Sequence, residues 1–226
     1  LKGLKRLEEG RDMDEWYLRE WAGVDPANGS PLWYTTDENG KRTTTDSYNK
    51  ADRVYCGSAA PKFTGGWMNS FSYKGFTLTA NFDFVYGNLL YNQSRELLDS
   101  DGAYADYNSM KLKSGWKRWE KEGDIATHPK AINGGNKNSN KSSSRYLEKG
   151  NYFSLRNLSL GYSIPEKLCG KLGLQRVNVS CSADNLFTLT PFSGVSPQLS
   201  DSSTDGYAGT IYPLSRRIVF GLNVSF

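Results

Sequence analysis

This sequence is poor in histidine and cysteine, and it contains no long apolar run. A transmembrane helix requires about 20 consecutive apolar residues, so a helical membrane protein is excluded. A nucleophilic triad needs a histidine base, and the only histidine, His128, lies in a polar segment, with no Gly-x-Ser-x-Gly motif in the sequence. The cysteines Cys56, Cys169 and Cys181 are widely spaced, which argues against a disulfide framework or a zinc site. We therefore expect no enzyme, no cofactor and no metal, and cysteines that are buried or face lipid.

The composition of the 226 residues leaves two β-rich classes open. A hydrophobic fraction of 37% is typical of a polar soluble protein. A membrane β-barrel fits this value as well, because only alternate residues of each strand face lipid. An aromatic content of 13%, with 14 Tyr and 6 Trp, fits both carbohydrate-binding modules and membrane barrels. The net charge of +4 is modest, and the basic residues are scattered along the chain. We therefore interpret the basic stretch Lys111–Arg118 as a solvated surface and expect no nucleic acid as a partner.

Period-two alternation between residues 66 and 86 predicts a β-hairpin that closes at Lys74-Gly75. This closure makes one face apolar except for Asn69, with these opposed pairs: Trp67 and Phe82, Asn69 and Ala80, Phe71 and Leu78, Tyr73 and Phe76. The other face is polar except for Met68, with these opposed pairs: Gly66 and Asp83, Met68 and Asn81, Ser70 and Thr79, Ser72 and Thr77. A single register sorts both strands, which chance seldom achieves.

The same alternation recurs in residues 152–162, 175–185 and 217–226, and more weakly in Met13–Trp21. Together these segments predict about six antiparallel strands, each near the 9–11 residues that cross a bilayer when tilted. The predicted fold class is therefore all-β. The polar residues Thr77, Thr79, Asn81 and Asp83 are expected to form a hydrated wall in the lumen of such a barrel.

The predicted connections are short at one end of the strands and long at the other. Lys74-Gly75 and Ile164–Gly173 are short, whereas residues 22–64, 87–150 and 187–214 are long. Outer-membrane barrels have short periplasmic turns and long extracellular loops. Aromatic residues near the strand ends fit the girdles at the two membrane interfaces: Tyr73, Phe76, Tyr162 and Phe226 at the short end, and Phe84, Tyr86 and Tyr152 at the long end. Alternation also describes a secreted β-sandwich that binds carbohydrate through exposed aromatic residues, and this alternative stays open.

Short blocks of residues, in one order along nearly the whole chain, resemble the SusC/RagA family of TonB-linked outer-membrane proteins. The blocks in the first half are Trp21–Pro26, Asn28-Gly29, Pro61–Gly66, Tyr73–Phe76 and Arg118-Trp119, followed by Gly123-Asp124 and Pro129. The blocks in the second half are Ser144–Tyr152, Leu155–Tyr162, Ile164-Pro165, Asp184–Thr188, Ser193-Gly194, Tyr212-Pro213 and Arg217. Each block is weak alone, but the ordered series is specific and disfavours a passive porin.

The resemblance implies that residues 1–226 are the C-terminal part of a transmembrane β-barrel of about 22 strands, with short helices in its long extracellular loops. The plug and the earlier strands would lie outside this sequence, as expected for a chain that begins at Leu1 without a Met or a leader. The family imports large nutrients, glycans or peptides, through the outer membrane of Gram-negative, Bacteroidetes-like cells. Its partners are a SusD-like surface lipoprotein, membrane lipid, and the TonB complex, which contacts the absent N-terminal part.

Four aromatic residues of the long segments are candidate substrate-binding residues: Trp33, Tyr34, Trp116 and Trp119. Aromatic rings stack on sugar faces and bury a large area. Packing of the loops against one another or against the lipoprotein is the competing and simpler interpretation of the same rings.

Two further features of the sequence have a possible role. The alternating terminal residues Phe220, Leu222, Val224 and Phe226 resemble the signal that barrel-insertion machinery recognises, by strand addition; filling the periplasmic aromatic girdle is a compatible role for Phe226. The run Asp99-Ser100-Asp101-Gly102 starts like a calcium loop, but no glutamate closes it at the required distance. A plain Asp-Gly turn is the preferred interpretation of this run.

Overall fold

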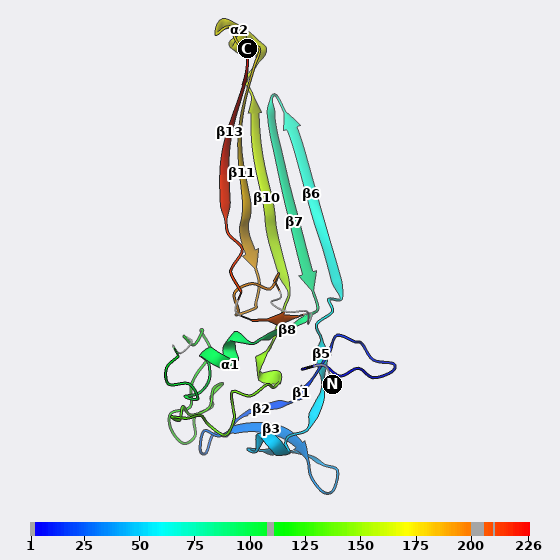
Figure 1. Ribbon diagram of the computed structural model, residues 1–226, viewed down its shortest axis with the longest axis vertical. Helices are drawn as coiled ribbons and strands as arrows, with labels where there is room; N and C mark the ends of the chain where they lie inside the picture. Colours follow the sequence, from blue (N-terminus) through cyan, green and yellow to red (C-terminus); the bar gives the residue numbers. More distant parts are fainter. Residues whose placement is uncertain (1–2, 108–110, 200–205, 210) are drawn as a thin grey trace. The chain divides into compact units, whose positions relative to one another are not determined.

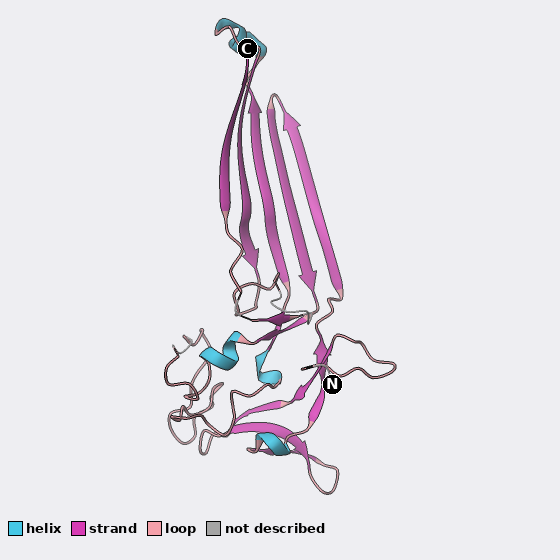
Figure 2. Ribbon diagram, in the orientation of Figure 1, coloured by secondary structure: helices cyan, strands magenta, loops and turns pink. Residues whose placement is uncertain are grey.

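The computed structural model of the protein describes residues 3–107, 111–199, 206–209 and 211–226. It divides into two compact units, drawn in Figures 1 and 2. We call them the strand unit (Pro61–Gly87, Gly150–Phe192 and Tyr212–Phe226) and the loop unit (Leu1–Ala60, Asn88–Lys149 and Ser193–Ile211). In the described part of the chain, no helix is both long enough and apolar enough to span a bilayer.

The strand unit is a single antiparallel sheet of five long strands (Figure 1). In spatial order the strands are β13 (Arg217–Ser225), β11 (Arg176–Leu189), β10 (Tyr152–Ser163), β7 (Phe76–Tyr86) and β6 (Phe63–Tyr73). The short helix α2 (Glu166–Lys171) and the turn between β6 and β7 lie at the same end of the sheet (Figure 1). Five of the roughly six strands predicted from alternation are thus confirmed. The sixth, Met13–Trp21, is wrong as a long strand, because it contains the short strand Glu15–Arg19 and only the first residue of a second strand, Trp21–Val24, in another sheet of the loop unit.

The predicted hairpin forms in the predicted register. Trp67 lies opposite Phe82, and Phe71 lies opposite Leu78. Lys74 and Gly75 both have a positive φ, of 45° and 85°, as a type I′ turn requires at its two central positions. A side chain at position 75 would also collide with the carbonyl oxygen of Ser163, 2.7 Å from an added Cβ, so glycine satisfies two constraints there.

The sheet has one apolar face and one polar face, and within the strand unit, all of whose residues are described, no second sheet covers the apolar face. The row Leu78, Leu160, Cys181 and Phe220 is typical of the apolar face. Phe71 is 62% exposed and Phe220 is 80% exposed. A β-sandwich buries such side chains beneath an opposing sheet, so the alternative of a secreted sandwich lacks its defining feature in the strand unit.

The described residues of the loop unit form three small sheets. The first pairs β1 (Glu15–Arg19) with β5 (Arg53–Ser58). The second has the order β2 (Trp21–Val24), β3 (Pro31–Thr36) and β4 (Arg42–Thr45), and the third has the order β12 (Tyr207–Ala208), β8 (Leu89–Asn92) and β9 (Leu147–Lys149). The helical segments are α1 (Ser94–Leu98) and the 3-10 turns η1 (Tyr48–Lys50) and η2 (Ser144–Tyr146). The segments predicted as long loops therefore fold into a unit of their own.

An aromatic core holds the loop unit together. Its buried members are Trp16, Leu18, Ala59, Tyr91 and Tyr146, which come from segments far apart in the sequence. The indole Nε1 of Trp16 donates a hydrogen bond to the carbonyl of Leu89 at 3.0 Å, so its polar atom is satisfied inside the core. Burying several large aromatic side chains supplies the hydrophobic stabilisation that an isolated loop lacks.

Of the three cysteines, Cys169 is buried within α2, as predicted. Cys181 lies on the apolar face of the sheet, opposite Phe220, and its contact with lipid stays a prediction. Cys56 is half-buried in the loop unit, and burial raises the pKa of its thiol to about 11. A thiol that stays protonated at neutral pH is a poor nucleophile and a poor metal ligand.

Candidate functional site

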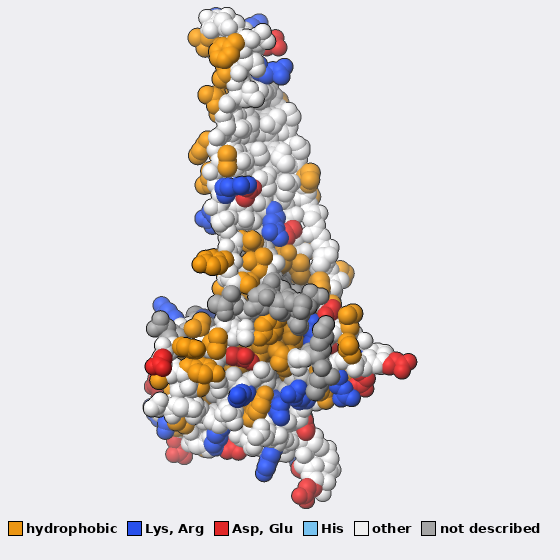
Figure 3. Space-filling view, in the orientation of Figure 1, with side chains coloured by type: hydrophobic (Ala, Val, Ile, Leu, Met, Phe, Trp, Pro, Cys, Tyr) orange, Lys and Arg blue, Asp and Glu red, His pale blue; other side chains and the backbone are white. Residues whose placement is uncertain are grey.

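The polar face of the strand unit carries mostly small side chains. One row across the sheet is Thr77, Gly161, Ser180 and Gly221, and the next is Thr79, Ser159, Ser182 and Val219. In Figure 3 the visible face of the sheet is mostly white, with charged side chains toward the end away from α2. Small polar groups leave such a face open to water, which is the property of a lumen wall.

Two adjacent strands bulge at the same level of this sheet. Between Leu155 and Asn157, β10 advances by two residues while β7 advances by one, which makes Arg156 the extra residue. Between Asp184 and Phe187, β11 has one residue more than β10, and Asn185 there has a φ of 53°. Bulges re-aim side chains and concentrate near barrel rims and functional sites. Here they place Arg156 and Asn185 in one polar pocket of about 300 Å³ on the sheet.

Ion pairs organise this bulged region. Arg156 Nε lies 2.9 Å from Asp83 Oδ1, and Arg217 Nη2 lies 2.7 Å from Asp184 Oδ2. Asp83 was predicted to be a plain hydrated wall residue, whereas it accepts hydrogen bonds from Arg156 and from the hydroxyl of Tyr152 at 2.9 Å. The assignment of Tyr152 to the lipid-facing girdle is wrong, because Tyr152 lies opposite Val85 and shares the face of Asp83.

Two of the four candidate substrate-binding rings are buried inside the loop unit. Trp33 is 0% exposed and its ring packs edge-on against the ring of Tyr48, with 5.5 Å between centroids. Trp119 is 8% exposed, and its Nε1 donates to the carbonyl of Pro26 at 3.0 Å. Gly29 has a φ of 73°, and a Cβ there would lie 2.5 Å from the Trp119 ring. These two rings thus pack the loops together, which leaves them no open face for a ligand.

Trp116 is half-buried and packs against an imidazole and a guanidinium group. Its ring centroid lies 4.9 Å from that of His128, and the guanidinium carbon of Arg95 lies 4.4 Å above it. A guanidinium over an indole face is a favourable cation–π arrangement. One face of Trp116 is therefore already occupied by Arg95.

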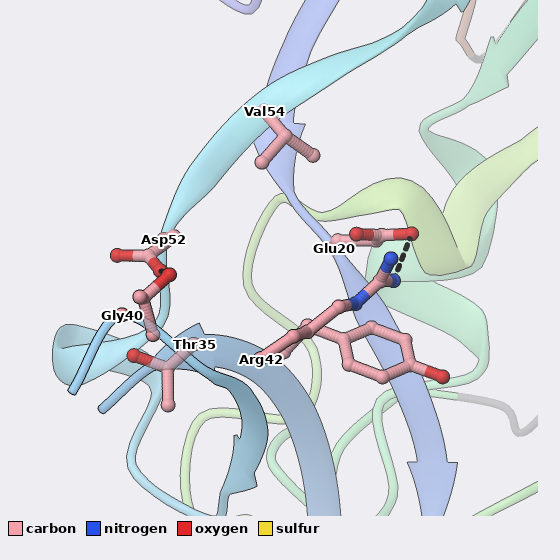
Figure 4. A pocket seen from close by; sticks show the side chains of 8 residues that line it. Glu20, Thr35, Gly40, Arg42, Asp52 and Val54 are labelled. Atoms are coloured by element: carbon pink, nitrogen blue, oxygen red, sulfur yellow. Dashed lines mark hydrogen bonds and ion pairs between the residues drawn. The ribbon is translucent and has the colours of Figure 1, made fainter.

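The candidate ring Tyr34 lines an open cavity. The Tyr34 pocket, of about 160 Å³, includes Glu20, Thr36, Arg42 and Asp52 in its wall. Figure 4 shows Arg42 reaching to Glu20, with a distance of 2.8 Å between Nη2 and Oε1, and Asp52 on the opposite side of the cavity. Arg42 also covers the ring of Tyr34 at 3.8 Å, and Thr36 Oγ1 donates to Asp52 Oδ2 at 2.8 Å. Carboxylate, guanidinium and hydroxyl groups thus converge on a space for one small polar group.

A buried ionic cluster lies close to Trp116. We define it as Arg95, Asp99, Asp101, Arg118, His128 and Arg145. Asp101 Oδ1 lies 2.7 Å from Arg118 Nη1, and Asp99 Oδ2 lies 2.6 Å from His128 Nε2. The carboxylates that resemble the start of a calcium loop therefore face guanidinium and imidazole groups. Among the described residues, no group of three or more His, Cys, Asp and Glu side chains is arranged to hold a metal ion.

The charges of this cluster set the protonation state of Asp99. Burial alone would raise the pKa of Asp99, but the hydrogen bond from His128 and the positive charge of Arg145 lower the pKa below its usual range. The opposite holds at Glu96, one turn away on α1, where burial raises the pKa despite a hydrogen bond from Tyr91. Asp99 is thus held as a carboxylate inside the loop unit.

The C-terminal residues continue the apolar face of the sheet. Phe220 and Leu222 on β13 are 80% and 70% exposed, and Phe226 is 83% exposed. Val224 lies opposite Val177 of β11. The position of these side chains suits recognition by an added strand, and the recognition itself stays a prediction.

Comparison with known proteins was made against family models, curated sequences and solved structures. No family model matches the chain. The TonB-dependent receptor P39 of Formosa agariphila is 32% identical over 181 residues, covering 77% of this chain and 17% of that receptor. The TonB-dependent receptor P3 of the same organism is 29% identical over 246 residues, covering 97% of this chain and 23% of that receptor.

Solved structures agree with these sequence matches. A structure of the RagAB peptide transporter matches with a TM-score of 0.75 and 28% identity, over 94% of this chain and 23% of that chain. The RagAB peptide importer in a closed-closed state matches with a TM-score of 0.74 and 27% identity, over 100% of this chain and 25% of that chain. The chain is a SusC/RagA-like TonB-dependent receptor segment.

The receptor segment spans between 17% and 23% of the length of these curated relatives. Its open five-stranded sheet matches part of the barrel fold of the RagAB structures, which confirms the predicted all-β barrel class. The relatives are receptors and transporters rather than enzymes, in agreement with the prediction of no catalysis.

Proposed function

We propose that this segment forms part of the barrel wall and extracellular loops of an outer-membrane importer for a large nutrient, a peptide or a glycan. The observation that carries the proposal is the two-faced sheet of the strand unit. Side chains such as Phe71 and Phe220 are exposed on one face, and the other face carries small polar residues and ion pairs. Lipid on the first side and a hydrated lumen on the second satisfy both faces.

The proposal includes a larger barrel around this sheet. Five strands do not close, and an open strand edge within hydrocarbon leaves backbone groups unpaired at a cost of several kcal/mol each. β6 and β13 are the edge strands of the sheet. Strands supplied by the remainder of the receptor would pair with both of them, giving a closed barrel of about 22 strands around a plug.

We assign the supply of energy for import and the capture of substrate to partners of this larger protein. Energy would come from a TonB complex that contacts the plug of this larger protein. A SusD-like surface lipoprotein would cover the extracellular side and share substrate contacts with the loop unit. The relation to the RagAB peptide transporter supports both the lipoprotein partner and, of the two substrate classes, peptides.

The Tyr34 pocket is proposed as a substrate contact within the loop unit. At about 160 Å³ it is smaller than the roughly 300–1,000 Å³ of a complete small-molecule site. It would therefore hold one group of a large substrate, such as the hydroxyls of a sugar ring or a charged side chain of a peptide. Glu20, Arg42 and Asp52 offer hydrogen-bond partners for either group.

Growth of a strain that lacks the full-length receptor tests the proposed function. The deletion strain is expected to lose growth on one peptide or glycan source and to recover it when the full-length gene is returned. A return of the gene with Tyr34→Ala should restore growth more slowly at limiting substrate, because the pocket loses its aromatic wall. Unchanged growth of the deletion strain on every peptide and glycan tested would refute the import role.

A further inference from the structure

The polar pocket of the strand unit is built from charged side chains on the face that we assign to the lumen. Its volume is about 300 Å³, at the lower end of the roughly 300–1,000 Å³ range of small-molecule sites. Its lining residues are Arg156, Asp184, Asn185, Ser215 and Arg217. All of them belong to the strand unit, so this cavity is separate from the Tyr34 pocket of the loop unit. We call it the arginine pocket.

The bulge in β10 puts two consecutive polar side chains on the face of this pocket. In a regular strand, Arg156 and Asn157 would point to opposite faces of the sheet. Here Asn157 lies opposite Asp184 and donates to its Oδ1 at 2.8 Å. Arg156 Nε donates to Asp83 on the same face. The bulge therefore concentrates polar groups at one level of the lumen wall.

The two guanidinium groups of the pocket have more donors than their described partners use. Each guanidinium carries five N–H donors. Arg156 donates through Nε to Asp83 at 2.9 Å, and it also interacts with the hydroxyl of Tyr152. Arg217 donates through Nε and Nη2 to one oxygen of Asp184, at 3.0 Å and 2.7 Å. The bonds to described residues thus leave donors on both guanidinium groups for a ligand.

The carboxylate that lines the pocket is already engaged. Asp184 Oδ1 accepts from Asn157, and Asp184 Oδ2 accepts two hydrogen bonds from Arg217. The side chains of Arg156 and Arg217 are 40% and 73% exposed, whereas that of Asp184 is 28% exposed. A ligand in this pocket therefore meets guanidinium donors more readily than carboxylate acceptors, which favours an anionic group.

Asn185 supplies an acceptor beside these donors. Its Nδ2 donates to the carbonyl of Ser215 at 3.1 Å, and its Oδ1 remains to accept a hydrogen bond. Donors for an anion next to an acceptor for an N–H match a carboxylate and a neighbouring amide of a peptide chain. A neutral sugar has no group that requires two guanidinium partners.

We propose that the arginine pocket binds a carboxylate of a peptide while the peptide passes along the lumen wall. The proposal rests on the proposed import function and adds the chemical group that is recognised. Arginine binds carboxylates through two parallel hydrogen bonds. With Asp83 and Asp184 included, the two arginines belong to a set of zero net charge, so the attraction is moderate. Moderate affinity suits a passage site, which must release what it binds.

Binding of four synthetic peptides to the purified full-length receptor tests the proposal. The peptides share one N-acetylated sequence, with Glu or Gln at the centre and a free or an amidated C-terminus. In calorimetry, the wild-type receptor should bind a peptide with the recognised carboxylate about tenfold more tightly than the peptide without any carboxylate. The two peptides with one carboxylate each show whether the C-terminus or the side chain is recognised. Equal affinity for all four peptides, or binding of none, would overturn the proposal.

Conservative variants separate recognition from a structural role. Arg156→Lys and Arg217→Lys keep the charge beside Asp83 and Asp184 but remove the planar donor fork. Each should reduce the carboxylate preference to less than about threefold, since lysine does not replace arginine in a bidentate pair. Arg176→Lys is the matched control, because Arg176 lies on the same polar face opposite Ser225 and outside the pocket. An equal loss of affinity for all four peptides would show that the arginines are structural and would overturn the proposal.

Two further outcomes concern the ligand and the import role. Tighter binding of oligogalacturonate than of any peptide would assign the pocket to an acidic glycan and overturn the peptide ligand. Growth of the deletion strain is a separate readout. Lost growth on peptides together with equal peptide affinities would leave import standing and overturn the pocket. A carboxylate preference without any loss of growth would support the pocket and contradict import.

Discussion

Arg145 and Asp101 face each other as a bidentate pair inside the loop unit, with Nη1 2.5 Å from Oδ2 and Nη2 3.2 Å from Oδ1. Their side chains are 2% and 0% exposed. The two residues lie 44 positions apart in the sequence, so this pair connects the segment after α1 to the 3-10 turn η2. A bidentate pair fixes both the position and the orientation of the two groups.

Replacing Arg145 should destabilise the loop unit. Arg145→Met leaves the buried Asp101 carboxylate with fewer partners, and removing one member of a buried pair costs about 3–5 kcal/mol. Limited proteolysis of the full-length receptor should then show faster cleavage in residues 88–149. Lys137→Gln is the matched control, because Lys137 pairs with Asp46 at the exposed surface and such pairs contribute about 0–1 kcal/mol. Equal cleavage of both variants would contradict the role of the buried pair.

Acid should weaken the loop unit through Asp99. The pKa of Asp99 is lowered in the folded state, so its ionised form stabilises the fold above the unfolded-state pKa of about 3.9. That contribution is lost as the pH falls through the lower, folded-state pKa. Asp99→Asn should therefore be less stable than wild type at pH 7, and the difference should shrink below about pH 4. Thermal unfolding of both proteins from pH 7 to pH 3 measures this difference, and a gap that stays constant would contradict the assignment.

The four candidate rings should separate into two groups when each is replaced. Trp33→Ala and Trp119→Ala remove buried aromatic side chains and should cost about 3–5 kcal/mol of loop-unit stability. Tyr34→Ala should lower substrate affinity severalfold while the loop unit keeps its resistance to protease, because Tyr34 lines an open pocket. Substrate titration and proteolysis on the same preparations distinguish these effects. Loss of protease resistance in Tyr34→Ala would show that this ring, too, is structural.

Deleting Phe226 from the full-length receptor should reduce its level in the outer membrane. The expectation follows from the terminal alternation, which places Phe226 in series with Leu222 and Phe220 on the apolar face. Ser225→Ala is the control, because Ser225 lies on the adjacent, polar side of the alternation. Quantitative blotting of membrane fractions measures the effect. Unchanged levels after the deletion would show that the terminal residue is not an assembly signal.

The period-two alternation of apolar and polar residues made the strands of the strand unit predictable from the sequence. The hairpin register was predictable because each one-residue shift would exchange the two faces, and Lys74-Gly75 marked the turn. The bulges were not predictable in this way. A break in phase between Leu155 and Leu158 is the available signal, since both residues are apolar although three positions apart, and this break places Arg156 beside Asp83.

Most of the fold of the loop unit could not be predicted from the sequence, because its contacts join residues that are far apart in the chain. Nothing local at Asp99 indicates that Arg118 and Arg145 will neutralise it. The same holds for Trp119, whose burial depends on Gly29. An aromatic residue in a loop has the same composition signal whether it binds a ligand or packs a core, so only the fold separates Tyr34 from Trp33.

The central claim is that one face of the strand unit touches hydrocarbon and the other touches water. Phe71 and Ser70 are adjacent on β6 and lie opposite Leu78 and Thr79, respectively. Each is replaced by cysteine in the full-length receptor, labelled with an environment-sensitive fluorophore and reconstituted in vesicles that contain brominated lipid. Quenching of the label at position 71 and not at position 70 is the predicted result. Equal quenching at both positions, or quenching at position 70 alone, would contradict the account.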